Sequence, residues 1–126
     1  MANPPVVLVI EDEALVRFSL TSYLEDSGFI CLEAADGQEG LDVFGRSHPD
    51  LVLTDLRMPR LDGFGVLATL RDRSPGTPVI VLSGTGDNTA ADDAMALGAR
   101  ICLFKPLYDM TLLTDTIRSI LGPDPH

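Results

Sequence analysis

The sequence predicts an α/β fold, a parallel sheet with helices packed on both of its faces. Five short apolar runs alternate with five helix-like segments from residue 6 to residue 121. Two of the runs, residues 6–10 and 51–54, are dominated by valine, leucine and isoleucine, which is typical of strands buried on both faces of a parallel sheet. Crossovers between parallel strands are right-handed, so helices are expected on both sides of the sheet.

The strands are expected at residues 6–10, 29–34, 51–54, 78–83 and 100–105. Turn-forming residues separate them from the helical segments. Pro75-Gly76 precedes the fourth strand, and Pro59, Asp62 and Gly63 follow the third.

Capping residues mark most of the expected helix ends. The first helix is expected from about Glu13 to Ser27, with Gly28 as the residue that ends it. Asp36, three residues before Glu39, is a capping-box-like start of a second helix that ends near residue 47. The third helix passes through Phe64, Leu67 and Leu70. The fourth is expected to be capped by Asn88 or Thr89 and to end at Gly98, and the fifth begins after Asp109 and ends at Gly122-Pro123.

Length and composition favour one domain inside the cell. The 126 residues suit a single domain over 1–126 with its core at about 6–121, and we expect no output domain within them. The net charge is −10 and the basic residues are scattered, so direct nucleic-acid binding is not expected. Because there is neither a membrane-length apolar run nor a secretory signal, we expect no membrane association and a cytoplasmic location.

Charged residues stand where three of the expected strands end. Glu11-Asp12-Glu13 follows the first strand, Asp55 follows the third, and Lys105, the only lysine, ends the fifth. Carboxyl ends of parallel strands meet at one edge of the sheet, where ligands bind. Grouped carboxylates suit Mg²⁺, and a cation beside them suits a phosphoryl group. Alternatively, each acid is a solvated charge at a helix start, where the helix dipole favours it.

Four segments carry a resemblance to a known family. VLVIEDE, LVLTDLRMPRLDG, VIVLSG and LFKP have the order and spacing of the receiver domain of two-component response regulators. The chain resembles this family from Val6 to Leu121. The resemblance implies a flavodoxin-like, doubly wound (βα)5 fold with a five-stranded parallel sheet in the order 2-1-3-4-5.

The resemblance also implies a set of site residues. Asp55 is similar to the phosphoacceptor that takes a phosphoryl group from phosphohistidine. Glu11 and Asp12 resemble the acidic pair that holds Mg²⁺, or alternatively Mn²⁺, together with Asp55. The backbone carbonyl of Arg57 would complete the metal ligands from the protein.

Further positions match the phosphoryl contacts of the family. Ser83 resembles the hydroxyl residue that hydrogen-bonds the phosphoryl group, and Lys105 resembles the cation that contacts another of its oxygens. The bond before Pro106 is a candidate cis peptide, because the matching proline usually follows one.

Three positions concern switching and phosphate lifetime. Cys102 stands where the family often has tyrosine or phenylalanine, so we expect switching through the loop from Gly84 to Asn88 and the fourth helix instead. Arg57 and Thr85 occupy positions that influence how fast the acyl phosphate hydrolyses. For Arg57, a solvated side chain without such a role is an equal alternative.

By resemblance the chain is a signalling phosphoacceptor that assists its own phosphorylation and dephosphorylation, and not an enzyme in the usual sense. Its expected partners are a sensor histidine kinase or a histidine phosphotransfer protein, an unknown output protein or domain, and a second copy bound through the fourth helix, fifth strand and fifth helix. The run VIVLSGTG with the KPLYD segment is also similar to receivers linked to PP2C-like phosphatase outputs.

Three other functions are alternatives for these residues. A dehalogenase-like phosphatase also uses an aspartate and Mg²⁺, but it needs a second acid where this chain has Arg57. A flavin or nucleotide binder needs a phosphate loop after the first strand, where this chain has three acids. A phosphorylation-independent interaction module is the third alternative.

Overall fold

The computed structural model describes residues 3–84, 88–105, 107 and 109–122, and its core is a five-stranded parallel sheet. The strands pair in the order β2-β1-β3-β4-β5. Their bounds are β1 Val6–Ile10, β2 Ile30–Ala34, β3 Leu51–Asp55, β4 Val79–Gly84 and β5 Ile101–Lys105. The predicted fold class and strand order are therefore confirmed, and each strand lies within a residue or two of its expected position.

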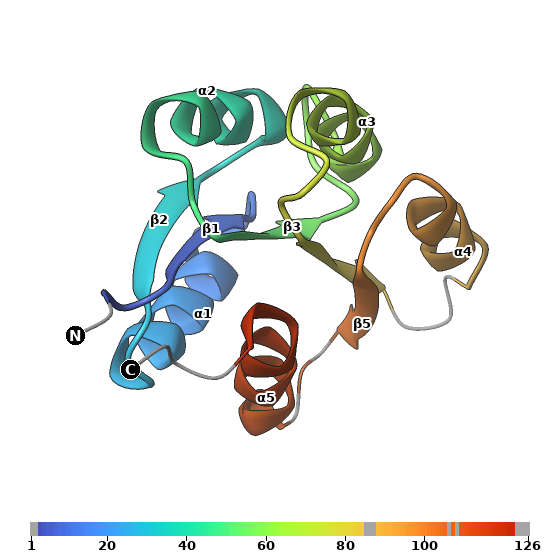
Figure 1. Ribbon diagram of the computed structural model, residues 1–126. Helices are drawn as coiled ribbons and strands as arrows, with labels where there is room; N and C mark the ends of the chain where they lie inside the picture. The colour runs from blue at the N-terminus through green and yellow to red at the C-terminus, as the bar shows by residue number, and fades with distance from the viewer. Residues whose placement is uncertain (1–2, 85–87, 106, 108, 123–126) are drawn as a thin grey trace.

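Five helices connect and cover these strands (Figure 1). Their bounds are α1 Ala14–Asp26, α2 Gly37–Ser47, α3 Gly63–Arg73, α4 Asn88–Ala96 and α5 Met110–Leu121. Helices α1 and α5 cover one face of the sheet, and α2, α3 and α4 cover the other. Among the described residues, no helix has both the length and the apolar character that a membrane span requires.

Alternate side chains of each strand supply the two halves of the core. In β1, Val7 and Val9 pack with the α1 and α5 side, whereas Leu8 and Ile10 pack with the α2, α3 and α4 side. All four are at most 1% exposed. This double burial explains why the strand is an uninterrupted apolar run and not an alternating one.

The predicted helix caps are largely present. The Asp36 carboxylate accepts a hydrogen bond from the backbone N–H of Glu39, and the Asp109 carboxylate accepts one from Thr111. Gly28 has a φ of +100°, a backbone conformation that side chains with a Cβ rarely adopt, so it ends α1 as expected. Helix α4 begins at Asn88, so Asn88 and Thr89 are its first residues and not its cap as predicted, and the cap position at residue 87 lies outside the described residues.

Candidate functional site

Strand register brings the charged strand ends to one edge of the sheet. Ile10 of β1 is paired with Thr54 of β3, so Glu11 and Asp55 follow side by side. Asp55 is in turn paired with Leu82 of β4, and Gly84 of β4 with Lys105 of β5. Residues far apart in the sequence are therefore neighbours at the carboxyl end of the sheet, where α/β proteins bind ligands.

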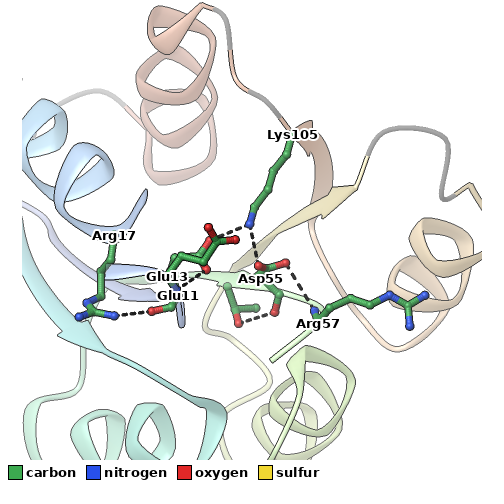
Figure 2. Close-up of polar contacts among 7 residues, drawn as sticks. Glu11, Glu13, Arg17, Asp55, Arg57 and Lys105 are labelled. Atoms are coloured by element: carbon green, nitrogen blue, oxygen red, sulfur yellow. Dashed lines mark hydrogen bonds and ion pairs between the residues drawn. The ribbon is translucent and has the colours of Figure 1, made fainter. Parts of the chain in front are cut away.

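Lys105 joins two of the acids directly. Its Nζ donates hydrogen bonds to Glu11 Oε1 at 2.7 Å and to Asp55 Oδ2 at 2.6 Å (Figure 2). Glu11 is 1% exposed, and the Asp55 side chain is also buried. Such short, charge-assisted bonds in a partly buried site are among the stronger hydrogen bonds in proteins.

The pKa directions follow from one ammonium serving two carboxylates. Burial raises the pKa of Glu11, and the hydrogen bond from Lys105 opposes this rise without cancelling it. Burial alone would lower the pKa of Lys105, but its hydrogen bonds to Asp55 and Glu11 outweigh burial and raise it. The contacts of Lys105 with the two acids thus more than offset the effect of burial on its pKa, whereas for Glu11 the effect of burial on the pKa prevails.

Asp12 completes a group of three acids. Glu11, Asp12 and Asp55 each offer an oxygen atom, and these atoms lie within 4.8 Å of one another. Asp12 is exposed, whereas the other two are buried. Three carboxylates and one ammonium leave two negative charges uncompensated among these four residues, and oxygen ligands of this kind suit a hard divalent cation.

The local backbone around Asp55 is held by the segment that follows it. Gly63, the first residue of α3, packs so closely on β3 that a Cβ there would lie 2.3 Å from the Asp55 carbonyl oxygen. Only glycine allows this approach. Asp62 caps α3 by accepting a hydrogen bond from Gly65 N–H at 3.0 Å, and Arg60 forms an ion pair with Asp36. The segment between β3 and α3 is therefore held by the cap at its α3 end and by an ion pair from Arg60 within it.

Ser83 and Arg57 also lie near the acids. Ser83, on β4, is 1% exposed, and its hydroxyl oxygen has no hydrogen-bond partner among the described residues. The Arg57 backbone N–H is 3.4 Å from Asp55 Oδ1, and its side chain extends away from the carboxylates (Figure 2). The structure thus brings Glu11, Asp12, Asp55 and Lys105 together, and strand register places Ser83 at the same edge of the sheet.

The remaining predicted positions lie elsewhere or outside the described residues. Cys102 is half-buried on the α4 side of β5, and its thiol donates to the Ala91 carbonyl oxygen at 3.6 Å. Pro106, the candidate cis peptide, and Thr85 lie outside the described residues. So do residues 85–87 of the loop that we expect to move.

A comparison with known protein families gives the assignment. Residues 7–118 match the response regulator receiver domain family, which is nearly the whole chain. The chain belongs to this family. Receiver domains are signalling phosphoacceptors that bind Mg²⁺ at an acidic pocket, and the cluster of Glu11, Asp12 and Asp55 is consistent with such a pocket.

Curated relatives of this receiver domain are longer regulators. It is 42% identical over 115 residues to a probable transcriptional regulator, ycf27, of Porphyridium aerugineum, covering 91% of this chain and 47% of that protein. It is 35% identical over 117 residues to the Regulator of RpoS of Escherichia coli K12, covering 93% of this chain and 35% of that protein. The chain therefore spans half or less of these relatives' length.

Solved structures agree with the fold. A response regulator receiver domain protein of Clostridium thermocellum is 34% identical, with a TM-score of 0.88 over 93% of this chain and 94% of that one. The receiver domain of NtrX from Brucella abortus is 28% identical, with a TM-score of 0.87 over 94% of this chain and 99% of that one.

Two contacts at the site were not anticipated from the sequence. The Glu13 backbone N–H donates to Glu11 Oε2 at 3.1 Å, and Arg17 Nη1 donates to the Glu11 carbonyl oxygen at 2.6 Å. A signal for Arg17 was available, because it lies in the first turn of the predicted helix, six residues after Glu11. An arginine so close in the sequence to the acids after a strand is a candidate for a contact with them.

Proposed function

We propose that Asp55 is the phosphoacceptor of this receiver domain and takes its phosphoryl group from a phosphohistidine of a sensor kinase or phosphotransfer protein. The observation that carries the proposal is the buried Asp55 carboxylate, which accepts a hydrogen bond from Lys105 Nζ and forms one group of acids with Glu11 and Asp12. A buried nucleophile beside an ammonium and beside oxygen ligands for a cation is what phosphoryl transfer requires, because its catalysis is mostly positioning and electrostatic stabilisation.

Glu11, Asp12 and Asp55 would hold Mg²⁺, with Mn²⁺ as the alternative and the backbone carbonyl of Arg57 as a further ligand. The donor set fits, because all three side chains offer oxygen atoms within one ion's reach and carry uncompensated negative charge. Exposed Asp12 leaves the outer side open to water and to the phosphoryl donor. When bound, the ion would neutralise charge on the phosphoryl oxygens.

In the proposed step, an Asp55 carboxylate oxygen attacks phosphorus. A bond forms between this oxygen and phosphorus, the P–N bond to the donor imidazole breaks, and the imidazole leaves with the electron pair of that bond. Lys105 Nζ, which now contacts Asp55 Oδ2, would move to an oxygen of the new phosphoryl group. The Ser83 hydroxyl, which has no hydrogen-bond partner among the described residues, would donate to another oxygen, which would give this buried polar atom a hydrogen bond.

The response of the surface would follow from these two movements. Ser83 is the last residue but one of β4, so its movement would shift the start of the connection to α4. Cys102 joins β5 to the Ala91 carbonyl of α4, which supports a path through α4 in place of an aromatic switch residue. The exposed side chain of Arg57 would modulate the lifetime of the acyl phosphate.

The test is phosphorylation by a small donor. The chain incubated with acetyl phosphate and Mg²⁺ should gain the mass of one phosphoryl group, and EDTA should prevent the gain. Asp55→Ala should remain unmodified, whereas the matched control Asp50→Ala, on the exposed acid that precedes β3, should be modified like the wild type. Modification of Asp55→Ala, or none of the wild type, would refute the assignment.

A further inference from the structure

Arg17 connects the acidic end of β1 to the rest of the sheet. It lies in the first turn of α1, and its side chain is mostly buried. Besides the 2.6 Å bond from Nη1 to the Glu11 carbonyl oxygen, its Nε is 3.3 Å from Glu33 Oε1 of β2 (Figure 2 shows Arg17 and Glu11). One guanidinium thus holds the carbonyl end of β1 and a side chain of the neighbouring strand.

The Glu11 carbonyl belongs to the peptide that leads to Asp12. Peptide groups are planar, so the direction of this carbonyl fixes the plane from which the Asp12 backbone starts. The other polar groups of Glu11 are held as well, because its N–H donates to the Ala34 carbonyl at 3.0 Å and its Oε2 accepts from Glu13 N–H. The hydrogen bond from Arg17 is therefore the contact that orients the peptide group between Glu11 and Asp12.

Arginine suits this position better than lysine. Its planar guanidinium donates in two directions at once, here to a carbonyl and to a carboxylate, while a lysine ammonium is a compact charge on a flexible stem. It also adds positive charge beside an acidic group without using any carboxylate of the cluster. The cluster of Glu11, Asp12 and Asp55 thus keeps its oxygen atoms available.

We infer that Arg17 is a positioning residue for the divalent cation: by holding the Glu11 carbonyl, it sets Glu11 and Asp12 in the arrangement that binds the ion. This inference rests on the proposed function. Groups that orient metal ligands typically contribute about 10–100-fold to affinity. Loss of Arg17 should therefore weaken Mg²⁺ binding by about tenfold.

Calorimetric titration with Mg²⁺ alone tests the inference without any phosphoryl donor. Arg17→Ala should raise the dissociation constant about tenfold, and Arg17→Lys should restore part of the loss. Glu33→Gln, which removes the charge of the second partner of Arg17 and leaves the Glu11 contact in place, should stay close to the wild type. With acetyl phosphate, Arg17→Ala should need more Mg²⁺ for half-maximal phosphorylation but reach a similar rate at saturation.

Unfolding by urea in EDTA shows whether each variant is folded. If Arg17→Ala does not fold, the Mg²⁺ affinity of Arg17→Lys tests the inference instead. Wild-type Mg²⁺ affinity in a folded Arg17→Ala, or no loss in Arg17→Lys when it is the only folded variant, would overturn the inference. An equal loss in Glu33→Gln would overturn it too, because the contact with Glu11 would then not be decisive. Asp12→Asn separates the two proposals: if it binds Mg²⁺ like the wild type, the proposed metal site itself fails.

Discussion

At the scale of single residues, Lys105 Nζ lies within hydrogen-bond distance of two acids that are 94 and 50 positions away in the sequence. It balances part of the charge that the fold gathers at this edge. Because burial keeps the pKa of Glu11 raised in spite of this contact, the site is still short of positive charge. A bound divalent cation should therefore offset the same excess of negative charge that Lys105 offsets in part.

We predict that Lys105→Met keeps the fold but lowers the free energy of unfolding in EDTA by about 1.5–3 kcal/mol at neutral pH, the usual range for a hydrogen bond to a charged group. Two carboxylates lose their shared donor. Saturating Mg²⁺ should recover part of the loss, and phosphorylation by acetyl phosphate should slow. Urea unfolding measures the first effect, and the exposed Arg100→Met serves as the matched control.

The same variant gives a pH dependence with a definite sign. The Glu11 carboxyl has a folded pKa above its ordinary 4.5, so its neutral form favours folding below 4.5 and this contribution is lost as pH rises through the folded pKa. Loss of Lys105 raises that pKa further. The free energy of unfolding that Lys105→Met loses relative to the wild type should therefore be smaller at about pH 5 than at about pH 7.5. A deficit that grows on acidification would contradict the assignment of the Glu11–Lys105 contact.

At the scale of elements, much of the site was predictable and part was not. The buried runs of β1 and β3 locate Glu11 and Asp55 at the same edge, because parallel strands buried on both faces have an unmistakable composition. The double contact of Lys105 depends on how β5 is placed beside β4 and on one rotamer, which no local pattern encodes. The Arg17 contact likewise depends on the turn before α1.

Helix α1 presents apolar side chains beside the site. Leu15 is 83% exposed and Phe18 is 67% exposed, and residues three apart lie on one helix face. Leu15 also lines a mainly apolar cavity of about 320 Å³ together with Leu82, Lys105 and Leu107. Exposed apolar groups of this kind often mark protein contacts, and this one borders the proposed phosphoacceptor edge.

We predict that α1 is the docking element for the phosphohistidine protein. Phe18→Ser should slow phosphotransfer from a phosphorylated histidine kinase that serves the wild type by about tenfold, as expected for loss of an aromatic anchor. The rate with acetyl phosphate should not change, because a small donor needs no docking surface. Leu112→Ser on α5 is the matched control. Equal slowing with both donors, or with neither, would contradict this docking site.

At the scale of the whole molecule, the proposed phosphoacceptor edge of the sheet and the candidate output surface are different regions that meet at the end of β5. Helix α4, strand β5 and helix α5 each expose a large apolar side chain, respectively Met95, Phe104 and Leu112. Phe104 directly precedes Lys105, so a shift of that lysine toward a phosphoryl oxygen would move the end of β5 next to it. A change of charge at Asp55 would thus reach this surface through Lys105 and the adjacent Phe104.

We predict that phosphorylation favours a dimer formed through α4, β5 and α5. Sedimentation with Mg²⁺ and beryllofluoride, a phosphoryl mimic, should show tighter self-association than Mg²⁺ alone. Phe104→Ser should weaken that association about tenfold or more, because truncating a buried aromatic anchor typically costs at least 1–2 kcal/mol. Phe18→Ser, on α1, should dimerise like the wild type. If beryllofluoride leaves the chain monomeric, or if Phe18→Ser and Phe104→Ser weaken the dimer equally, this surface is not the interface.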